Sequence, residues 1–301
     1  MKYAFALTAV CALSLATASC GLASGSARSE HVGALRGDSL RGRVLLVASS
    51  TSRLNLKSGR SAPVGFQLSE LAIPAQTLLD AGYEVVVATP DGKKPAMDEA
   101  STSAEEFAGN ASAFRRAFQF AHWYPSMQHP LTLAAAGEQI ASFAGIYVPA
   151  GRAAMNDLMV DPDLGRILRL AHEAGKPTAL LGHGAVAALA TLPRAVEYKN
   201  ALLSGDEPAA RLSADAWTYR GYRMTAFSNE EEQRVETGKL NDSLPFHVTD
   251  AVRQAGANVE SAPKGQSFVV RDRELITGQN AASERAMAEE MVKALDERTQ
   301  G

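Results

Sequence analysis

Short apolar runs rich in β-branched residues recur along this chain and alternate with segments of helical periodicity. Four such runs lie at residues 44–48, 83–89, 145–149 and 177–181. Runs of this kind are typical of parallel strands that are buried on both faces of a sheet. The alternation therefore predicts an α/β fold, in which a mostly parallel sheet is covered by helices on both faces.

The segments between these strands complete the predicted architecture. A helix is expected to begin with Pro74 as its first helical residue and to end at Gly82. Further helices are predicted over residues 163–174, 185–192 and 281–295, and further strands over residues 223–227 and 268–271. Residues 101–139 follow no regular pattern, so we expect them to form a small inserted cap over one edge of the sheet.

The first twenty residues have the layout of a secretory signal. Lys2 supplies a positive charge, residues 3–16 are apolar and uncharged, and small residues precede Cys20. Residues 17–20 resemble a bacterial lipobox, so we expect Cys20 to carry the lipid of a membrane-anchored lipoprotein. Cleavage after Ala18 is the alternative, and it gives a periplasmic or secreted protein. We predict a signal peptide over residues 1–20, a flexible tether over 21–42 and one folded domain over 43–298.

Cysteine content and charge exclude several classes of function. The chain has two cysteines, Cys11 and Cys20, and both belong to the predicted signal. The folded body can therefore hold no disulfide, no thiolate metal site and no catalytic thiol. With 30 Lys and Arg against 33 Asp and Glu, the net charge is −3. No basic stripe is present, so we expect no nucleic-acid partner.

Residues 178–184 read Thr-Ala-Leu-Leu-Gly-His-Gly. An apolar strand here enters a turn of small residues and continues as a helix. This order is typical of a nucleophile elbow, in which a strained turn at the carboxyl end of a strand presents one side chain to a crevice. Gly182 occupies the presented position, and His183 follows it.

With this elbow, the chain resembles the ThiJ/PfpI superfamily, which has a class I glutamine amidotransferase-like fold, and in particular its longer chaperone and glyoxalase III-like branch. The matching segments follow in order over residues 43–295, and they are Gly65-Phe66 with Glu70 and Pro74, residues 88–95 with Asp98 and Ser101, residues 148–158, His183-Gly184, residues 227–231 and residues 275–280. The resemblance implies a flavodoxin-like sandwich.

The resemblance also implies a site. The family uses a carboxylic acid beside a nucleophilic cysteine, and Glu70 matches the acid, whereas Gly182 stands where the cysteine is expected. His183 matches the elbow histidine. In the loop that forms the oxyanion pocket, Arg152 replaces a histidine and Ala150 and Ala153 replace glycines.

The third acid that some members use is left open between Asp206 and Glu207. A glycine at the elbow relaxes the strained turn while it removes the nucleophile. We therefore expect no catalytic residues and interpret the chain as a small-molecule-binding or chaperone-like pseudoenzyme. A glyoxalase III-like or deglycase-like enzyme with an altered mechanism is one alternative, and a paralogue that binds a partner through its surface is another.

The predicted ligand-binding residues are Glu70, Arg152, Gly182 and His183, and the predicted ligand is a small anionic or carbonyl compound. We expect a small void at Gly182, into which Arg152 points to recruit an anion; pairing of Arg152 with Glu70 is the other arrangement. No cofactor is expected, and a homodimer is left open.

Two further groups of residues receive ordinary interpretations. No metal site is expected, because His122 and His129 come without a placed acid. Residues 230–232, three consecutive glutamates, are interpreted as a solvated helix start that the helix dipole favours.

Overall fold

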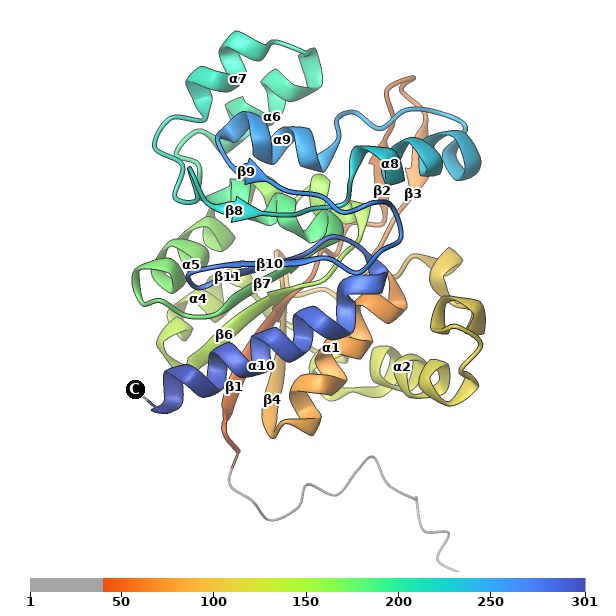
Figure 1. The fold of residues 1–301 in the computed structure, drawn as a ribbon, viewed down its shortest axis with the longest axis vertical. Helices are drawn as coiled ribbons and strands as arrows, with labels where there is room; N and C mark the ends of the chain where they lie inside the picture. The colour runs from red at the N-terminus through yellow and green to blue at the C-terminus, as the bar shows by residue number, and fades with distance from the viewer. Residues whose placement is uncertain (1–39, 301) are drawn as a thin grey trace, which may run out of the picture. The chain divides into compact units, whose positions relative to one another are not determined.

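The computed structural model describes residues 40–300, and a seven-stranded sheet lies at its centre (Figure 1). The strands of the sheet are β1 (Gly42–Val47), β4 (Tyr83–Thr89), β5 (Leu131–Thr132), β6 (Phe143–Val148), β7 (Thr178–Leu181), β10 (Val269–Asp272) and β11 (Leu275–Gly278). Their order is β10-β11-β7-β6-β1-β4-β5, and β10 alone runs antiparallel to its neighbour. The predicted mostly parallel α/β fold is confirmed.

Both faces of the sheet are buried, as the apolar runs require. In β1, Leu45 and Val47 belong to one hydrophobic core, whereas Val44 and Leu46 belong to the other. One core lies under α1 (Leu68–Asp80), α2 (Ala111–Trp123) and α10 (Glu284–Gln300). The other lies under α4 (Leu133–Glu138), α5 (Pro162–Glu173) and the 3₁₀ helix η6 (Gly182–Thr191). Helices thus cover both faces (Figure 1).

Residues 101–139 do not form the inserted cap that the sequence suggested. They contain α2, α3 (Pro125–Gln128), β5 and α4, and β5 pairs with β4 in register Ala88↔Leu131. The Tyr124 hydroxyl donates to the carbonyl oxygen of Val85 at 2.9 Å, which ties this segment to the sheet. Burial of Phe120 and Met127 fixes it there. The segment therefore extends one edge of the sandwich.

A layer of short elements above the sheet comes instead from residues 195–259 (Figure 1). It consists of α6 (Ala195–Ser204), α7 (Glu207–Ser213), α8 (Asn229–Val235), α9 (Val248–Ala255) and the parallel pair β8 (Arg223–Met224) and β9 (Asn258–Val259). The strand predicted at 223–227 is thus limited to two residues that pair outside the main sheet. A hairpin of β2 (Arg53–Asn55) and β3 (Ser61–Pro63) contacts this layer through its turn, where the Lys57 N–H donates to the carbonyl oxygen of Ser243 at 2.9 Å.

Short helical turns link these elements. They are the 3₁₀ helices η1 (Glu99–Ser101), η2 (Ala104–Phe107), η3 (Ile140–Ser142), η4 (Arg152–Met155), η5 (Leu158–Val160) and η8 (Ala281–Ser283), and the π-helix η7 (Glu236–Leu240). No helix between residues 40 and 300 combines the length and the apolar character needed to cross a bilayer. The predicted signal, Cys20 and all but three residues of the tether lie outside the described residues.

Helix α1 begins six residues earlier than the sequence indicated, and Pro74 lies inside it. A proline within a helix has no N–H to donate to the carbonyl four residues before it. That carbonyl belongs to Glu70, and the Tyr147 hydroxyl in β6 donates to it instead. A contact from the sheet therefore replaces the missing helical bond, and α1 continues through the proline.

Candidate functional site

The turn after β7 has the backbone conformation of an elbow. Gly182 has φ +54°, in the left-handed region that disfavours residues with a side chain. A Cβ atom built at Gly182 would lie 3.1 Å from the Cβ of Ala150, 3.6 Å from Oε2 of Glu70 and 3.7 Å from the carbonyl oxygen of Gln279. The predicted elbow geometry is therefore present, and it directs the position of residue 182 toward Glu70.

A second glycine lets the elbow approach the end of β6. A Cβ atom at Gly184 would lie 2.6 Å from the carbonyl oxygen of Pro149, which is closer than such atoms come in folded proteins. The start of η6 therefore packs directly on the backbone that leads into residues 150–155. This close approach brings Ala150 next to Gly182.

Glu70 lies in the first turn of α1 and is buried. The pKa of Glu70 is raised to about 8, mainly by burial and also by the nearby carboxylates of Glu284, Glu106 and Glu231, while Arg152 acts to lower it. At neutral pH the Glu70 carboxyl group therefore carries a proton. Beside Gly182 it presents a hydrogen-bond donor, and a carbonyl oxygen is a suitable acceptor for such a group.

His183 is held by an acid that the sequence analysis assigned to another role. The Nε2 atom of His183 lies 3.1 Å and 3.2 Å from the two carboxylate oxygens of Glu232, and the imidazole stacks on Phe227 at 4.6 Å between ring centroids. Glu232 is fully buried. The interpretation of residues 230–232 as a solvated helix start is therefore wrong for Glu232, which turns inward one helical turn after the cap.

The two acids proposed for this place lie elsewhere. Asp206 caps α7 by accepting from the backbone N–H of Ala209, and Glu207 pairs with Arg211 on the surface. The available signal for Glu232 was Phe227, an apolar residue directly before the Ser228 cap of α8. Such a residue marks the buried side of a helix start, and Glu232 lies on that side.

The interpretation as a solvated helix start is also wrong for Glu231, which is buried and joins three loops near the elbow. Its Oε1 accepts from the Gly265 N–H at 2.9 Å and from Nδ2 of Asn280 at 2.7 Å. Its Oε2 accepts from Oγ of Ser228 at 2.7 Å and from Nε2 of Gln279 at 3.1 Å. Burial acts to raise the pKa of Glu231, but these hydrogen bonds outweigh it and keep the pKa below the usual value. Glu231 is therefore a charged structural residue.

Arg152 pairs with an acid that the sequence analysis did not consider as its partner. Its Nη2 lies 3.4 Å from Oδ2 of Asp98, and the side chain of Gln67 donates to the same oxygen at 2.9 Å. Both charged side chains are nearly buried. Arg152 therefore does not pair with Glu70 and does not extend into solvent. Its guanidinium pairs instead with the carboxylate of Asp98 in the 96–98 loop.

The expected void at Gly182 is not a ligand-sized cavity. A cavity of about 10 Å³ lies next to the elbow, and its wall includes Ser49, Phe66, Ala150 and Gly151. Such a volume holds one water molecule at most. Neither Glu70 nor His183 lines it, because the Ala150 side chain takes the space in front of Gly182.

Among residues 40–300, no three His, Cys, Asp or Glu side chains are arranged so that they could hold a metal ion. His122 stacks on Phe118 at 3.9 Å between ring centroids, and its Nδ1 lies 2.9 Å from the Phe118 carbonyl oxygen. Its surroundings are those of an aromatic side chain packed along α2.

The sequence matches no protein-family model. Glutamine amidotransferase-like class 1 domain-containing protein 1 of Bos taurus is 32% identical over 209 residues, covering 69% of this chain and 78% of that protein. The protein/nucleic acid deglycase HchA of Pseudomonas aeruginosa is 22% identical over 260 residues, covering 84% and 80%. The crystal structure of glyoxalase III from Candida albicans superposes with a TM-score of 0.60 at 19% identity, covering 85% of this chain and 98% of that one.

Proposed function

Because this chain belongs to the family of glutamine amidotransferase-like class 1 domain-containing proteins, we propose that it is an exported, non-catalytic member of ThiJ/PfpI type that works by binding. The observation that carries the proposal is Gly182. It has the left-handed backbone of an elbow and the neighbourhood of Glu70, yet it offers no side chain that can attack a carbonyl carbon. Leu181 and His183 flank it, so no hydroxyl takes over that role.

The protonated state of Glu70 supports a small carbonyl or carboxyl compound as the ligand of this elbow. At neutral pH the protonated Glu70 carboxyl group can donate a hydrogen bond to a ligand in the space in front of Gly182. Since Ala150 fills that space and Asp98 engages Arg152, entry of a ligand requires residues 150–152 to move. A carboxylate ligand would then take the place of Asp98 on the Arg152 guanidinium.

The decisive experiment measures methylglyoxal turnover by the full chain, with and without iodoacetamide. We expect turnover close to the uncatalysed background and no effect of the reagent, because residues 21–301 contain no cysteine. Gly182→Cys is the matched variant. It should restore no turnover, because the new side chain meets Ala150 at 3.1 Å and takes up a strained backbone conformation.

One observation favours a second candidate, an enzyme of altered mechanism related in chemistry to glyoxalase III. His183, which pairs with Glu232, directly follows Gly182, and the Cβ position of Gly182 faces the protonated Glu70, so the elbow offers a base and an acid. Robust turnover by the wild-type chain that His183→Ala abolishes would establish this candidate and refute the non-catalytic one.

Export is the remaining part of the proposal, and the layout of residues 1–20 supports it. Mass spectrometry of the native protein should find a lipid-modified Cys20 at the mature N-terminus. A mature chain that starts directly after Ala18 without lipid would establish the soluble exported form, and an intact Met1 in the cytoplasm would refute export.

A further inference from the structure

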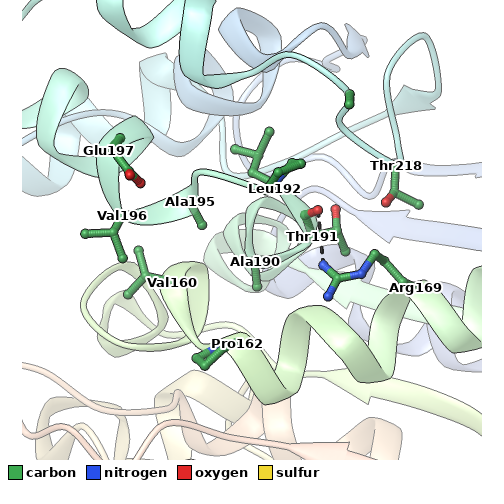
Figure 2. Close-up of a pocket in the computed structure, with 12 residues that line it drawn as sticks. Val160, Pro162, Arg169, Ala190, Thr191, Leu192, Ala195, Val196, Glu197 and Thr218 are labelled. Atoms are coloured by element: carbon green, nitrogen blue, oxygen red, sulfur yellow. Dashed lines mark hydrogen bonds between the residues drawn. The ribbon is translucent and has the colours of Figure 1, made fainter.

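We propose that a cavity at the far end of η6 binds a small organic monocarboxylate with an apolar body. The cavity has a volume of about 420 Å³ and lies between α5, the end of η6 and the start of α6 (Figure 2). This volume falls in the range of small-molecule sites. Gly182 begins η6 and Thr191 ends it, so the cavity is separated from the elbow by the whole length of this ten-residue helix.

Arg169 supplies the recognition group. It lies on α5, is half-buried and lines the cavity together with Thr191 and Thr218, which gather at the same end of the cavity in Figure 2. Its Nη1 donates to the Thr191 carbonyl oxygen at 3.3 Å, and none of the ion pairs formed within residues 40–300 involves it. The Thr191 hydroxyl donates to the carbonyl oxygen of Ala188 at 2.8 Å, so Arg169 and Thr218 supply the donors that remain. A guanidinium with most of its five donors unused suits a carboxylate.

The opposite part of the cavity is apolar. Val160, Pro162, Ala190, Leu192, Ala195 and Val196 line it. Val196 is 54% exposed, and an apolar ligand body would cover it. Burial of that body supplies binding free energy in proportion to the apolar area removed from water.

Glu197 decides between ligands with one and with two carboxylates. It lies at the rim, in the first turn of α6, away from Arg169 (Figure 2). A ligand that carries a second carboxylate at its far end would place it near Glu197 and be repelled. The charge arrangement therefore selects a monocarboxylate over a dicarboxylate of similar length.

The wall that carries Arg169 is firmly placed. A Cβ atom at Gly165 would lie 2.1 Å from the Ala190 carbonyl oxygen and 3.2 Å from Nη1 of Arg169. Glycine at this position thus allows α5 to pack on the backbone of η6 and leaves room for the guanidinium. The site is formed before any ligand arrives, so little of the binding free energy is lost in ordering it.

The test is calorimetric titration of the full chain with phenylacetate, compared with neutral phenylacetamide and with the dicarboxylate adipate. We expect phenylacetate to bind at least about 10-fold more tightly than the other two. Arg169→Gln should weaken phenylacetate binding by about 10-fold or more. Arg166→Gln is the matched control, because Arg166 lies one turn earlier on α5 and pairs with Asp163, and it should leave binding unchanged.

Arg169→Gln also removes the bond to Thr191, so a measurement on the wild-type chain locates the ligand independently. On addition of phenylacetate, the backbone amide NMR signals of Thr191 and Thr218 should shift, whereas that of Gly182 should not. The proposal is overturned if phenylacetate fails to bind at millimolar concentration, if Arg169→Gln binds as well as wild type, or if Glu70→Gln abolishes binding, since the last result would assign the ligand to the elbow.

Discussion

Two buried glutamates, Glu70 at the elbow and Glu231 at the start of α8, have carboxyl groups in opposite charge states. Burial raises the pKa of Glu70 to about 8, and within residues 40–300 no group hydrogen-bonds to its carboxyl oxygens. Glu231 is buried as well, but it accepts hydrogen bonds from Ser228, Gly265, Gln279 and Asn280, and its pKa is lowered.

Burial alone therefore does not decide whether a carboxyl group in this protein is charged; the number of donors that face it does. The donors around Glu231 join three separate loops, so its charge stabilises the fold. Because no donor in the described part of the chain faces Glu70, its carboxyl group stays protonated at the elbow, where it can donate a hydrogen bond to a ligand. One residue type thus serves two purposes a short distance apart.

The largest effect on stability should come from removing Glu231, the charged one of the two glutamates. Glu231→Ala leaves the side-chain amides of Gln279 and Asn280 and the N–H of Gly265 without their acceptor, so we expect the free energy of unfolding to fall by about 3–5 kcal/mol. Urea denaturation measures this. Glu230→Ala is the control, because the neighbouring Glu230 forms an exposed pair with Lys264, and its loss should cost about 0.5 kcal/mol. Equal effects of the two variants would show that the Glu231 network is not stabilising.

Per pH unit, a smaller effect should appear in the pH dependence of stability. The folded-state pKa of Glu70 is raised, so the folded chain binds a proton more tightly than the unfolded chain between about pH 5 and pH 8. Stability should therefore decrease as the pH rises through this window, by at most about 1.4 kcal/mol per pH unit from this group. Burial raises the pKa of Glu284 to about 7, and this group acts in the same direction.

Thermal unfolding of wild type and Glu70→Gln across this range tests the assignment. The amide cannot ionise, so the variant should lose the part of the pH dependence that comes from Glu70 and keep the part that comes from Glu284. A variant with the full wild-type slope would mean that the Glu70 carboxyl group is already ionised at neutral pH.

The smallest effect concerns the space in front of Glu70. Gly182→Ala places a methyl group 3.1 Å from Ala150 on a left-handed backbone, and we expect a loss of about 1–3 kcal/mol. Gly205→Ala is a matched control, since Gly205 has φ +71° and nothing within 4 Å of its Cβ position. It should lose only the cost of the backbone, about 1 kcal/mol. The double variant Gly182→Ala with Ala150→Gly should recover the difference.

The sequence predicted the central part of the sheet well, because strands that are buried on both faces must be apolar throughout. Residues 83–89 form β4 with the predicted bounds, and β1, β6 and β7 differ from the prediction by one or two residues at their ends. The elbow could be predicted for a related reason. A turn that needs a left-handed residue and lies against the backbone of β6 leaves a run of small residues in the sequence.

The rest depends on contacts between residues far apart in the chain. Glu232 is chemically suited to a solvated helix start. It is buried because it pairs with His183, which lies 49 residues earlier in the chain. Arg152 was assigned to the elbow because Asp98, 54 residues away, could not be placed beside it from the sequence. The β8 and β9 pair is too short for its residues to show a pattern.

Because Pro74 has no N–H, the carbonyl oxygen of Glu70 accepts from the Tyr147 hydroxyl instead. This bond has a consequence for the order in which the protein folds. The bond between Tyr147 and the Glu70 carbonyl joins residues 77 apart in the chain, so α1 cannot complete its own hydrogen bonding before β6 has docked. A peptide of residues 68–80 alone should break at Pro74. Helix α1 and the central strand are therefore expected to form in one cooperative event, and the placement of Glu70 at the elbow becomes fixed only when the sheet assembles.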